Sequence, residues 1–259
     1  MALTKLSDIN AHARDRNIFF DEAPHIYFID GKPANTSVTS LVHQYFPKFD
    51  ADAIIDKMMN SPWWYKNKYY GQTKDEIKEQ WKQSGIFACT HGTYMHKTIE
   101  EYYNGWPLSH PDTPEFDMFL SFAQDHKNLV KAYRTEWEVY IEEYDLAGSI
   151  DMVFQNLEDD TYSIYDWKRT REIKYTNKYS KGFGALSAYD DCNYVHYSLQ
   201  LNIYKYILET KYGMTIRDMY LVCMYPEYEN YKKIEVLNLQ DEVGKILAER
   251  KEKLASSAK

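Results

Sequence analysis

Two runs of alternating residues within positions 148–168 constrain the fold of this chain more than any other feature. Side chains of a β-strand alternate between its two faces, so Asp166 and Lys168 in the second run must point the same way. Asp151 occupies the first run, and the polar residues 155–160 between the runs are short enough for a hairpin connection. The pattern predicts neighbouring strands that bring two carboxylates and one ammonium group together. Such carboxylates suit a divalent cation, and the lysine suits a water molecule or a phosphate beside it.

The chain has 259 residues and a hydrophobic fraction of 44%, which is enough for the core of one large domain. We expect a core formed by residues 90–259, with residues 1–89 packed on it as an N-terminal hairpin and helical elaboration. The formal net charge of −8 argues against a protein that coats nucleic acid through its overall charge. A local basic cleft remains compatible with that charge.

The three cysteines, Cys89, Cys192 and Cys223, are far apart and form no C-x-x-C pair. This argues against a disulfide framework, a zinc ribbon or a four-cysteine iron–sulfur cluster, and it fits a reducing compartment. The first ten residues contain no apolar run typical of a signal peptide, and no stretch approaches the roughly 20 apolar residues that span a bilayer. We therefore expect a soluble intracellular protein with no membrane partner.

Helical spacing predicts one helix over residues 74–82, a break at Gly85 and a second helix over residues 90–103. In the second helix His96 and Glu100 are four residues apart and share one face. The pattern predicts a further helix over 116–133 and a strand over 135–142. Later, it predicts a helix over 193–211, strands over 218–225 and 233–237, and a final helix over 240–254.

An aromatic segment covers residues 61–71, where tryptophans and tyrosines are interleaved with lysines. Aromatic rings that alternate with lysines can stack on bases and hold phosphates. A packed aromatic cluster with solvated lysines is the other reading, and it is the commoner one.

The most cationic stretch of this acidic protein directly follows Lys168. Such a segment can hold a phosphate backbone beside a bound metal, so we expect it to contact DNA. Basic loops are also common on protein surfaces without such a role. The expected DNA-binding residues are Arg169, Arg171, Lys174, Lys178 and Lys181.

These elements, taken in order, resemble the PD-(D/E)XK nuclease superfamily, specifically its RecB-like and phage-lambda-exonuclease-like branch. They are also similar to the exonucleases of viruses and of mitochondrial genome maintenance. The resemblance covers about residues 90–204 and implies an α/β (α+β) fold, with a mixed central sheet flanked by helices in a restriction-endonuclease-like core. The matching elements are His96 with Glu100, Glu136 in Thr-Glu-Trp, Asp151 in Gly-Ser-Ile-Asp, Asp166-Trp167-Lys168, and Gln200 to Tyr204 as Q-x-x-x-Y.

The resemblance implies a Mg²⁺ or Mn²⁺ site. Its ligands would be His96, Asp151, Asp166 and the backbone carbonyl of Trp167. Lys168 would orient or help to deprotonate the attacking water and offset charge on the phosphate. Phosphodiester hydrolysis needs a hydroxide near neutral pH and neutralisation of developing negative charge, which a divalent cation supplies.

The resemblance also implies that Gln200 and Tyr204 hold the DNA strand or the active-site loop, and that Glu100 and Glu136 add outer-sphere contacts. It thus predicts a metal-dependent deoxyribonuclease, and in the first place an exonuclease that acts on DNA ends in recombination, repair or replication. A structure-specific endonuclease with the same site, and a catalytically idle DNA-binding scaffold, are the alternatives. A recombination or replication protein is a possible partner.

Overall fold

The computed structural model describes residues 5–257, so the first four residues of the expected N-terminal region lie outside it. A mixed six-stranded sheet forms the centre, with strand order β4-β6-β7-β8-β9 and β5 paired with β6. Pairing is parallel for β4/β6 and β7/β8 and antiparallel for the other neighbours. This confirms the predicted α+β fold with a mixed central sheet. The strands are β4 (Thr36–Ser37), β5 (Val130–Ile141), β6 (Leu146–Asn156), β7 (Tyr162–Lys168), β8 (Ile216–Cys223) and β9 (Lys232–Glu235).

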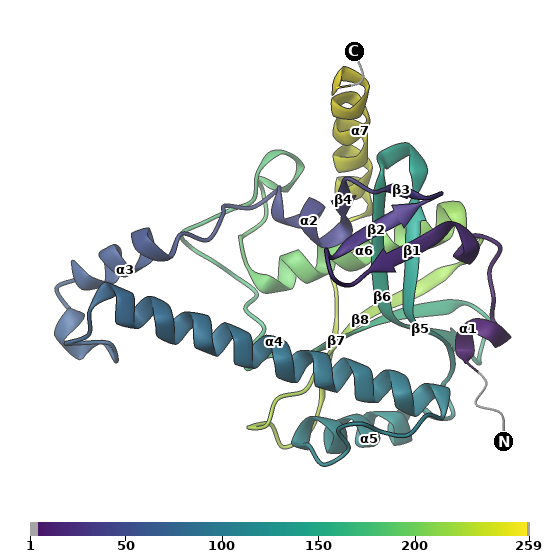
Figure 1. Ribbon diagram of the computed structural model, residues 1–259, viewed down its shortest axis with the longest axis horizontal. Helices are drawn as coiled ribbons and strands as arrows, with labels where there is room; N and C mark the ends of the chain where they lie inside the picture. The colour runs from purple at the N-terminus through teal and green to yellow at the C-terminus, as the bar shows by residue number, and fades with distance from the viewer. Residues whose placement is uncertain (1–4, 258–259) are drawn as a thin grey trace.

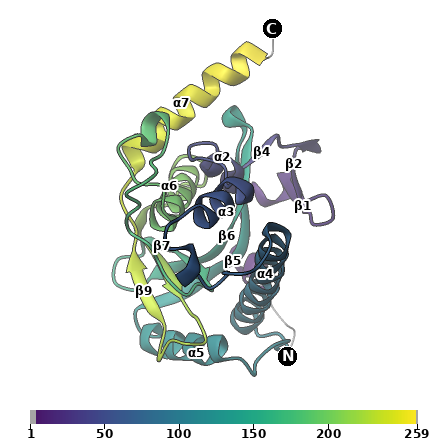
Figure 2. The ribbon, with the colours of Figure 1, turned by 90° about the vertical axis from the view of Figure 1, so that its left-hand side faces the viewer.

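Helices cover both faces of this sheet, and each face has its own apolar core (Figures 1 and 2). One core lies under α2, α6 and α7, and the other lies under α4 and α5. Ser37 caps α2, because its side chain accepts a hydrogen bond from the Ser40 amide. The helices are α1 (Leu6–Ile9), α2 (Val38–His43), α3 (Ala51–Met59), α4 (Lys74–Asn104), α5 (Pro114–His126), α6 (Asn193–Lys211) and α7 (Gln240–Ser257), with short 3₁₀ turns η1 (Asp15–Asn17), η2 (Trp64–Lys66), η3 (Glu142–Tyr144) and η4 (Gly184–Leu186).

A second, three-stranded sheet comes from the N-terminal hairpin and lies against β5 and β6 (Figure 1). It consists of β1 (Ile18–Asp21), β2 (Ile26–Ile29) and β3 (Lys32–Pro33). Ile18 from this sheet packs against Tyr140 and Ala147 of the large sheet. The N-terminal elaboration is therefore packed on the core, and its β4 is itself a strand of the large sheet.

The predicted break at Gly85 is wrong, because α4 is one uninterrupted helix of 31 residues. A glycine inside a helix costs only about 1 kcal/mol, which the remaining turns and a capping box at Thr73 outweigh. The expected domain boundary after residue 89 falls inside this helix. Figure 1 shows α4 extending past the sheet toward α3, so one rigid element joins the periphery to the centre.

The predicted helix over 116–133 is also too long, because α5 ends at His126 and β5 begins at Val130. Val130 pairs with Asn156 at the end of β6, and this tertiary pairing overrides the helical spacing of the apolar residues. Leu129, an apolar residue of the predicted helix, lies in the turn between α5 and β5 and is 59% exposed.

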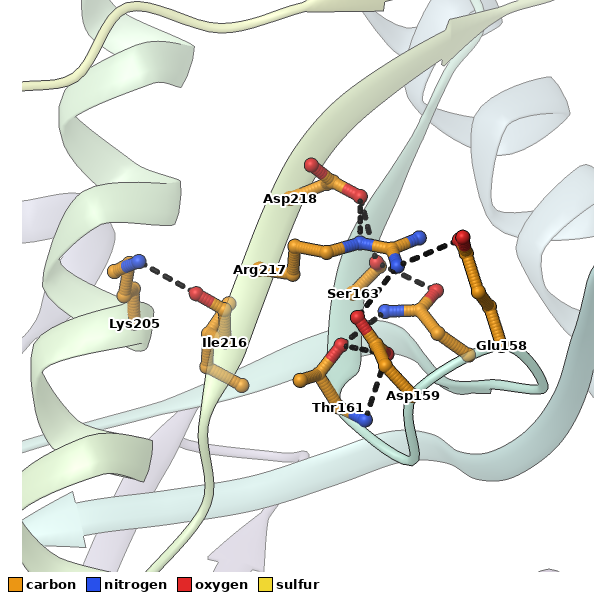
Figure 3. A network of polar contacts seen from close by, with 9 residues as sticks. Glu158, Asp159, Thr161, Ser163, Lys205, Ile216, Arg217 and Asp218 are labelled. Atoms are coloured by element: carbon orange, nitrogen blue, oxygen red, sulfur yellow. Dashed lines mark hydrogen bonds and ion pairs between the residues drawn. The ribbon is translucent and has the colours of Figure 1, made fainter.

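The hairpin between β6 and β7 is fixed by a polar network around Arg217 at the start of β8 (Figure 3). The Arg217 guanidinium contacts Glu158, Asp159 and Asp218, and Asp159 also accepts hydrogen bonds from Thr161. These ion pairs are partly exposed and contribute little stability each. Their effect is to hold the hairpin end of the sheet, far from the acidic residues of β6 and β7.

The aromatic segment 61–71 matches neither reading alone. Trp81 donates a hydrogen bond to the hydroxyl of Tyr69, so part of the segment is packed on α4. Trp63 is 64% exposed, and Lys66 lies over its ring.

Among the helices of residues 5–257, none has the length and apolar character that a bilayer span needs.

Candidate metal-binding and catalytic site

The site lies where β6 and β7 separate. On the edge of β6 that faces away from β5, pairing with β4 ends at Ala147 and pairing with β7 starts at Met152, so within residues 5–257 the stretch 148–151 has a strand neighbour only on its β5 side. The Trp167 amide has no main-chain partner in β6, and it donates a 2.8 Å hydrogen bond to Oδ2 of Asp151. The divergence thus opens a gap in the sheet, and Asp151 projects into it.

His96 brings α4 to this gap. Its Nε2 lies 2.9 Å from the main-chain carbonyl oxygen of Trp167, and its Nδ1 lies 3.5 Å from Glu136 and 3.6 Å from Asp151. Burial alone would lower the pKa of His96, but the Asp151 and Glu136 carboxylates outweigh it and raise this pKa to about 9. The imidazole therefore carries a positive charge at neutral pH when no cation is present.

Glu136 lies closer to the centre of the site than the expected outer-sphere role implies. Its carboxylate, His96 and Asp151 each offer a ligand atom, and these atoms lie within 4.8 Å of one another. The register of β5 on β6 places Glu136 opposite Asp151. Glu136 has a φ of +42°, a left-handed conformation that costs an ordinary residue about 1–3 kcal/mol. This strained position in mid-strand directs the carboxylate to the cluster.

Asp166 and Lys168 point the same way, as the alternation of β7 predicts. Lys168 Nζ lies 2.6 Å from Oδ2 of Asp166, at ion-pair distance but without hydrogen-bond geometry, and Asp166 is 3% exposed. Burial raises the pKa of Asp166 to about 6 even though the lysine opposes the shift. The Lys168 ammonium also lies 4.7 Å from the ring centroid of Tyr197. Asp166 is thus held by Lys168 beside the cluster of His96, Glu136 and Asp151.

Gln200 and Tyr204 occupy the face of α6 turned toward the gap. Tyr204 is buried, and a Cβ on Gly148 would lie 2.8 Å from its hydroxyl oxygen. Tyr204 therefore packs directly on β6 three residues before Asp151, where it positions the strand. Gln200 is half-buried and contacts the Tyr204 hydroxyl.

Two more side chains border the acidic cluster. Glu100 lies one helical turn after His96, and burial, together with the nearby Glu136, raises its pKa to about 6. Tyr27 from β2 was not expected here. Burial and then the charges of Glu138, Glu136 and Asp151 raise its pKa. No pattern in the sequence announces Tyr27, because only the docking of the N-terminal hairpin brings it to the site.

The basic segment after β7 divides into two parts. Arg169 is 8% exposed and pairs with the buried Glu115 at 2.6 Å, so this residue lies inside the fold rather than on an open cationic surface. Arg171 is 73% exposed, in contact with Glu227. Lys174, Lys178 and Lys181 are exposed, and Lys181 also contacts Asp190.

No protein-family model matches this sequence, and no curated protein matches it. Among solved structures, the chain is similar to the crystal structure of SSO0001, with a TM-score of 0.30 and 18% sequence identity. The similarity covers 53% of this chain and 58% of that one.

Proposed function

We propose that this protein is a metal-dependent DNA nuclease of the PD-(D/E)XK type, and specifically an exonuclease that acts on DNA ends. The observation that supports the proposal is the convergence of a histidine, three carboxylates, a lysine and a main-chain carbonyl at the gap between β6 and β7. They come from α4, β5, β6 and β7. A scaffold has no evident need to keep like charges adjacent in a buried position.

The donor set fits Mg²⁺ or Mn²⁺. Carboxylate and carbonyl oxygens are the ligands these ions prefer, and a single imidazole is compatible with Mn²⁺. Asp151, Glu136, His96 and the Trp167 carbonyl would hold the ion, with Asp166 beside them. A bound cation would activate water and neutralise charge that develops on the phosphate.

The remaining groups act on the substrate. Lys168 holds its ammonium beside Asp166, where it orients the attacking water and offsets charge on the scissile phosphate. Gln200 and Tyr204 keep the opened edge of β6 in place. The exposed lysines after β7 contact the phosphate backbone.

The test is cleavage of end-labelled linear, nicked and closed circular DNA by the purified protein with Mg²⁺, Mn²⁺ or EDTA. We expect linear DNA to be degraded with either metal and closed circles to resist. Lys168→Ala should abolish cleavage and leave DNA binding largely intact, whereas Lys131→Ala, an exposed lysine of β5, should cleave normally.

If closed circles are cut as fast as linear duplex, the protein is an endonuclease and not an exonuclease. If neither metal supports cleavage of any substrate, the scaffold reading stands. Equal turnover by Lys168→Ala and the unaltered protein would remove the proposed role of this lysine.

A further inference from the structure

An open groove of about 950 Å³ lies between α4 and the residues that follow β7 and β8. From residue 82 to 89 every residue of α4 is exposed, although the stretch contains Ile86 and Phe87. Phe87 is 56% exposed, and one helical turn further its ring meets that of His91 at 4.1 Å. The two rings form an aromatic surface on α4 that other described residues leave partly open.

The opposite wall of the groove is cationic. It includes Arg169, Thr170 and Arg171, and Tyr225 completes it. The Arg169 guanidinium lies 5.6 Å from the ring centroid of Phe87 and 5.3 Å from that of Tyr225. Its ion pair with Glu115 fixes this position, so the cation and the rings are preorganised. Arg171 is exposed, and its surface pair with Glu227 is weak enough to be exchanged for a phosphate.

The groove begins one residue after the proposed nuclease site along the chain. Lys168 belongs to that site, and Arg169, the next residue, lines the groove. In β8, Cys223 pairs with Lys168 of β7, and Tyr225 follows Cys223 by two residues. The ends of β7 and β8 therefore place the groove residues Arg169, Arg171 and Tyr225 close along the chain to Lys168.

We propose that this groove binds unpaired nucleotides of the DNA strand adjacent to the scissile phosphate. Their bases stack on Phe87 and His91, and their phosphates meet Arg171. Aromatic platforms with a cationic rim are the usual means of holding single-stranded nucleic acid, because every base offers a flat face and every linkage a negative charge. The inference rests on the proposed function, since it assigns the groove to the substrate of that site.

The test is the Kd of the full chain for a fluorescent single-stranded DNA of about 15 nucleotides, a length that spans a site of this kind. The measurement is made in EDTA so that no cleavage occurs. An abasic strand of the same length provides the same phosphates without bases. Phe87→Ala should weaken binding of the normal strand about 5- to 100-fold, and His91→Ala should act in the same direction. Both variants should bind the abasic strand as the unaltered protein does.

Leu129→Ala is the matched control, because this side chain is equally exposed but lies at the hairpin end of the sheet. Alanine is a strong helix former, so the α4 variants keep the fold. Normal binding by both Phe87→Ala and His91→Ala would overturn the proposal, and so would an equal loss on the abasic strand. If the protein cleaves no DNA but Phe87→Ala still weakens base-dependent binding, the groove stands and the nuclease proposal fails. Cleavage together with an unchanged Kd removes the groove alone.

Discussion

Nε2 of His96 and the main-chain carbonyl oxygen of Trp167 lie 2.9 Å apart across 71 residues of sequence. Two neighbouring ligands of an octahedral ion with bonds of about 2.1 Å are separated by about 3.0 Å, so this spacing suits a shared cation as well as a hydrogen bond. Without a cation, the charged imidazole lies between this carbonyl and the carboxylates of Glu136 and Asp151. The imidazolium thus supplies the positive charge that a bound cation would bring to these carboxylates.

Cation binding should release protons. His96, with its pKa raised to about 9, must lose a proton before it can bind an ion, and Asp166, with its pKa near 6, must be charged. We expect Mn²⁺ affinity to rise with pH up to about 9 and roughly one proton to be released per ion at pH 7.5. Calorimetry in buffers of different ionisation enthalpy measures this number. His96→Gln should release far fewer protons, and equal release by both proteins would exclude the imidazole as a ligand.

The stability of the metal-free protein should fall with rising pH. The folded pKa of His96 is raised above its ordinary value of 6.5 to about 9, so its contribution is complete below about pH 6.5 and is lost as the pH rises through 9. We expect a loss on the order of 1–3 kcal/mol in the free energy of unfolding between these limits. Urea unfolding in EDTA measures it. His96→Gln should flatten this dependence, and an unchanged slope in that variant would contradict the assignment.

Alternation and helical spacing were sufficient to predict the two central strands and their hairpin, because both depend on neighbours in sequence. β6 and β7 pair as predicted, and α6 covers the predicted residues 193–211. The separation of β6 from β7 on the N-terminal side of Met152 could not be predicted, since after Tyr165 β7 keeps only its pairing with β8. That departure depends on a strand more than 50 residues further along the chain.

Side-chain environment was the least predictable feature of the candidate site. Arg169 belongs to a basic run in the sequence, but in the structure it is buried together with its ion-pair partner Glu115 of α5. Glu136 resembles any alternating strand residue until its φ of +42° is known. In both cases a distant element decides the role. Local pattern fixes the direction of a side chain, whereas tertiary packing fixes its partner.

Glu136→Asn should stabilise the metal-free protein and weaken its affinity for Mn²⁺. Asparagine adopts positive φ readily, so the variant relieves strain and removes one carboxylate from the cluster. We expect a gain of about 0.5–1 kcal/mol in the free energy of unfolding in EDTA at pH 10, where His96 is neutral and its lost attraction to Glu136 does not count, with Mn²⁺ affinity measured by calorimetry. Glu138→Asn, two residues along the same strand, is the control and should show no such gain. A loss of stability in Glu136→Asn would contradict the backbone strain assigned to Glu136.

Lys168→Ala should destabilise the metal-free protein more at pH 8 than at pH 5. Asp166 is buried with this lysine as its ion-pair partner, and the lost attraction counts only where the carboxyl is charged, above its pKa of about 6. We expect a cost on the order of 1–3 kcal/mol at pH 8, measured by urea unfolding in EDTA. Asp166→Asn combined with Lys168→Ala should recover much of this cost. An equal cost at both pH values would show that the ion pair is not its source.

Gly148→Ala should destabilise the fold through Tyr204. The added Cβ would lie 2.8 Å from the hydroxyl oxygen and 2.9 Å from Cε1 of Tyr204, closer than packed atoms allow. We expect a loss of about 1–3 kcal/mol in the free energy of unfolding, measured by urea denaturation. Because Tyr204→Ala removes the main clash, Gly148→Ala should cost less in that background. Gly85→Ala is the control: no neighbouring atom lies within 4 Å, so it should instead stabilise α4 by about 0.5–1 kcal/mol. Equal costs of Gly148→Ala with and without Tyr204 would mean that this tyrosine does not hold β6 beside Asp151.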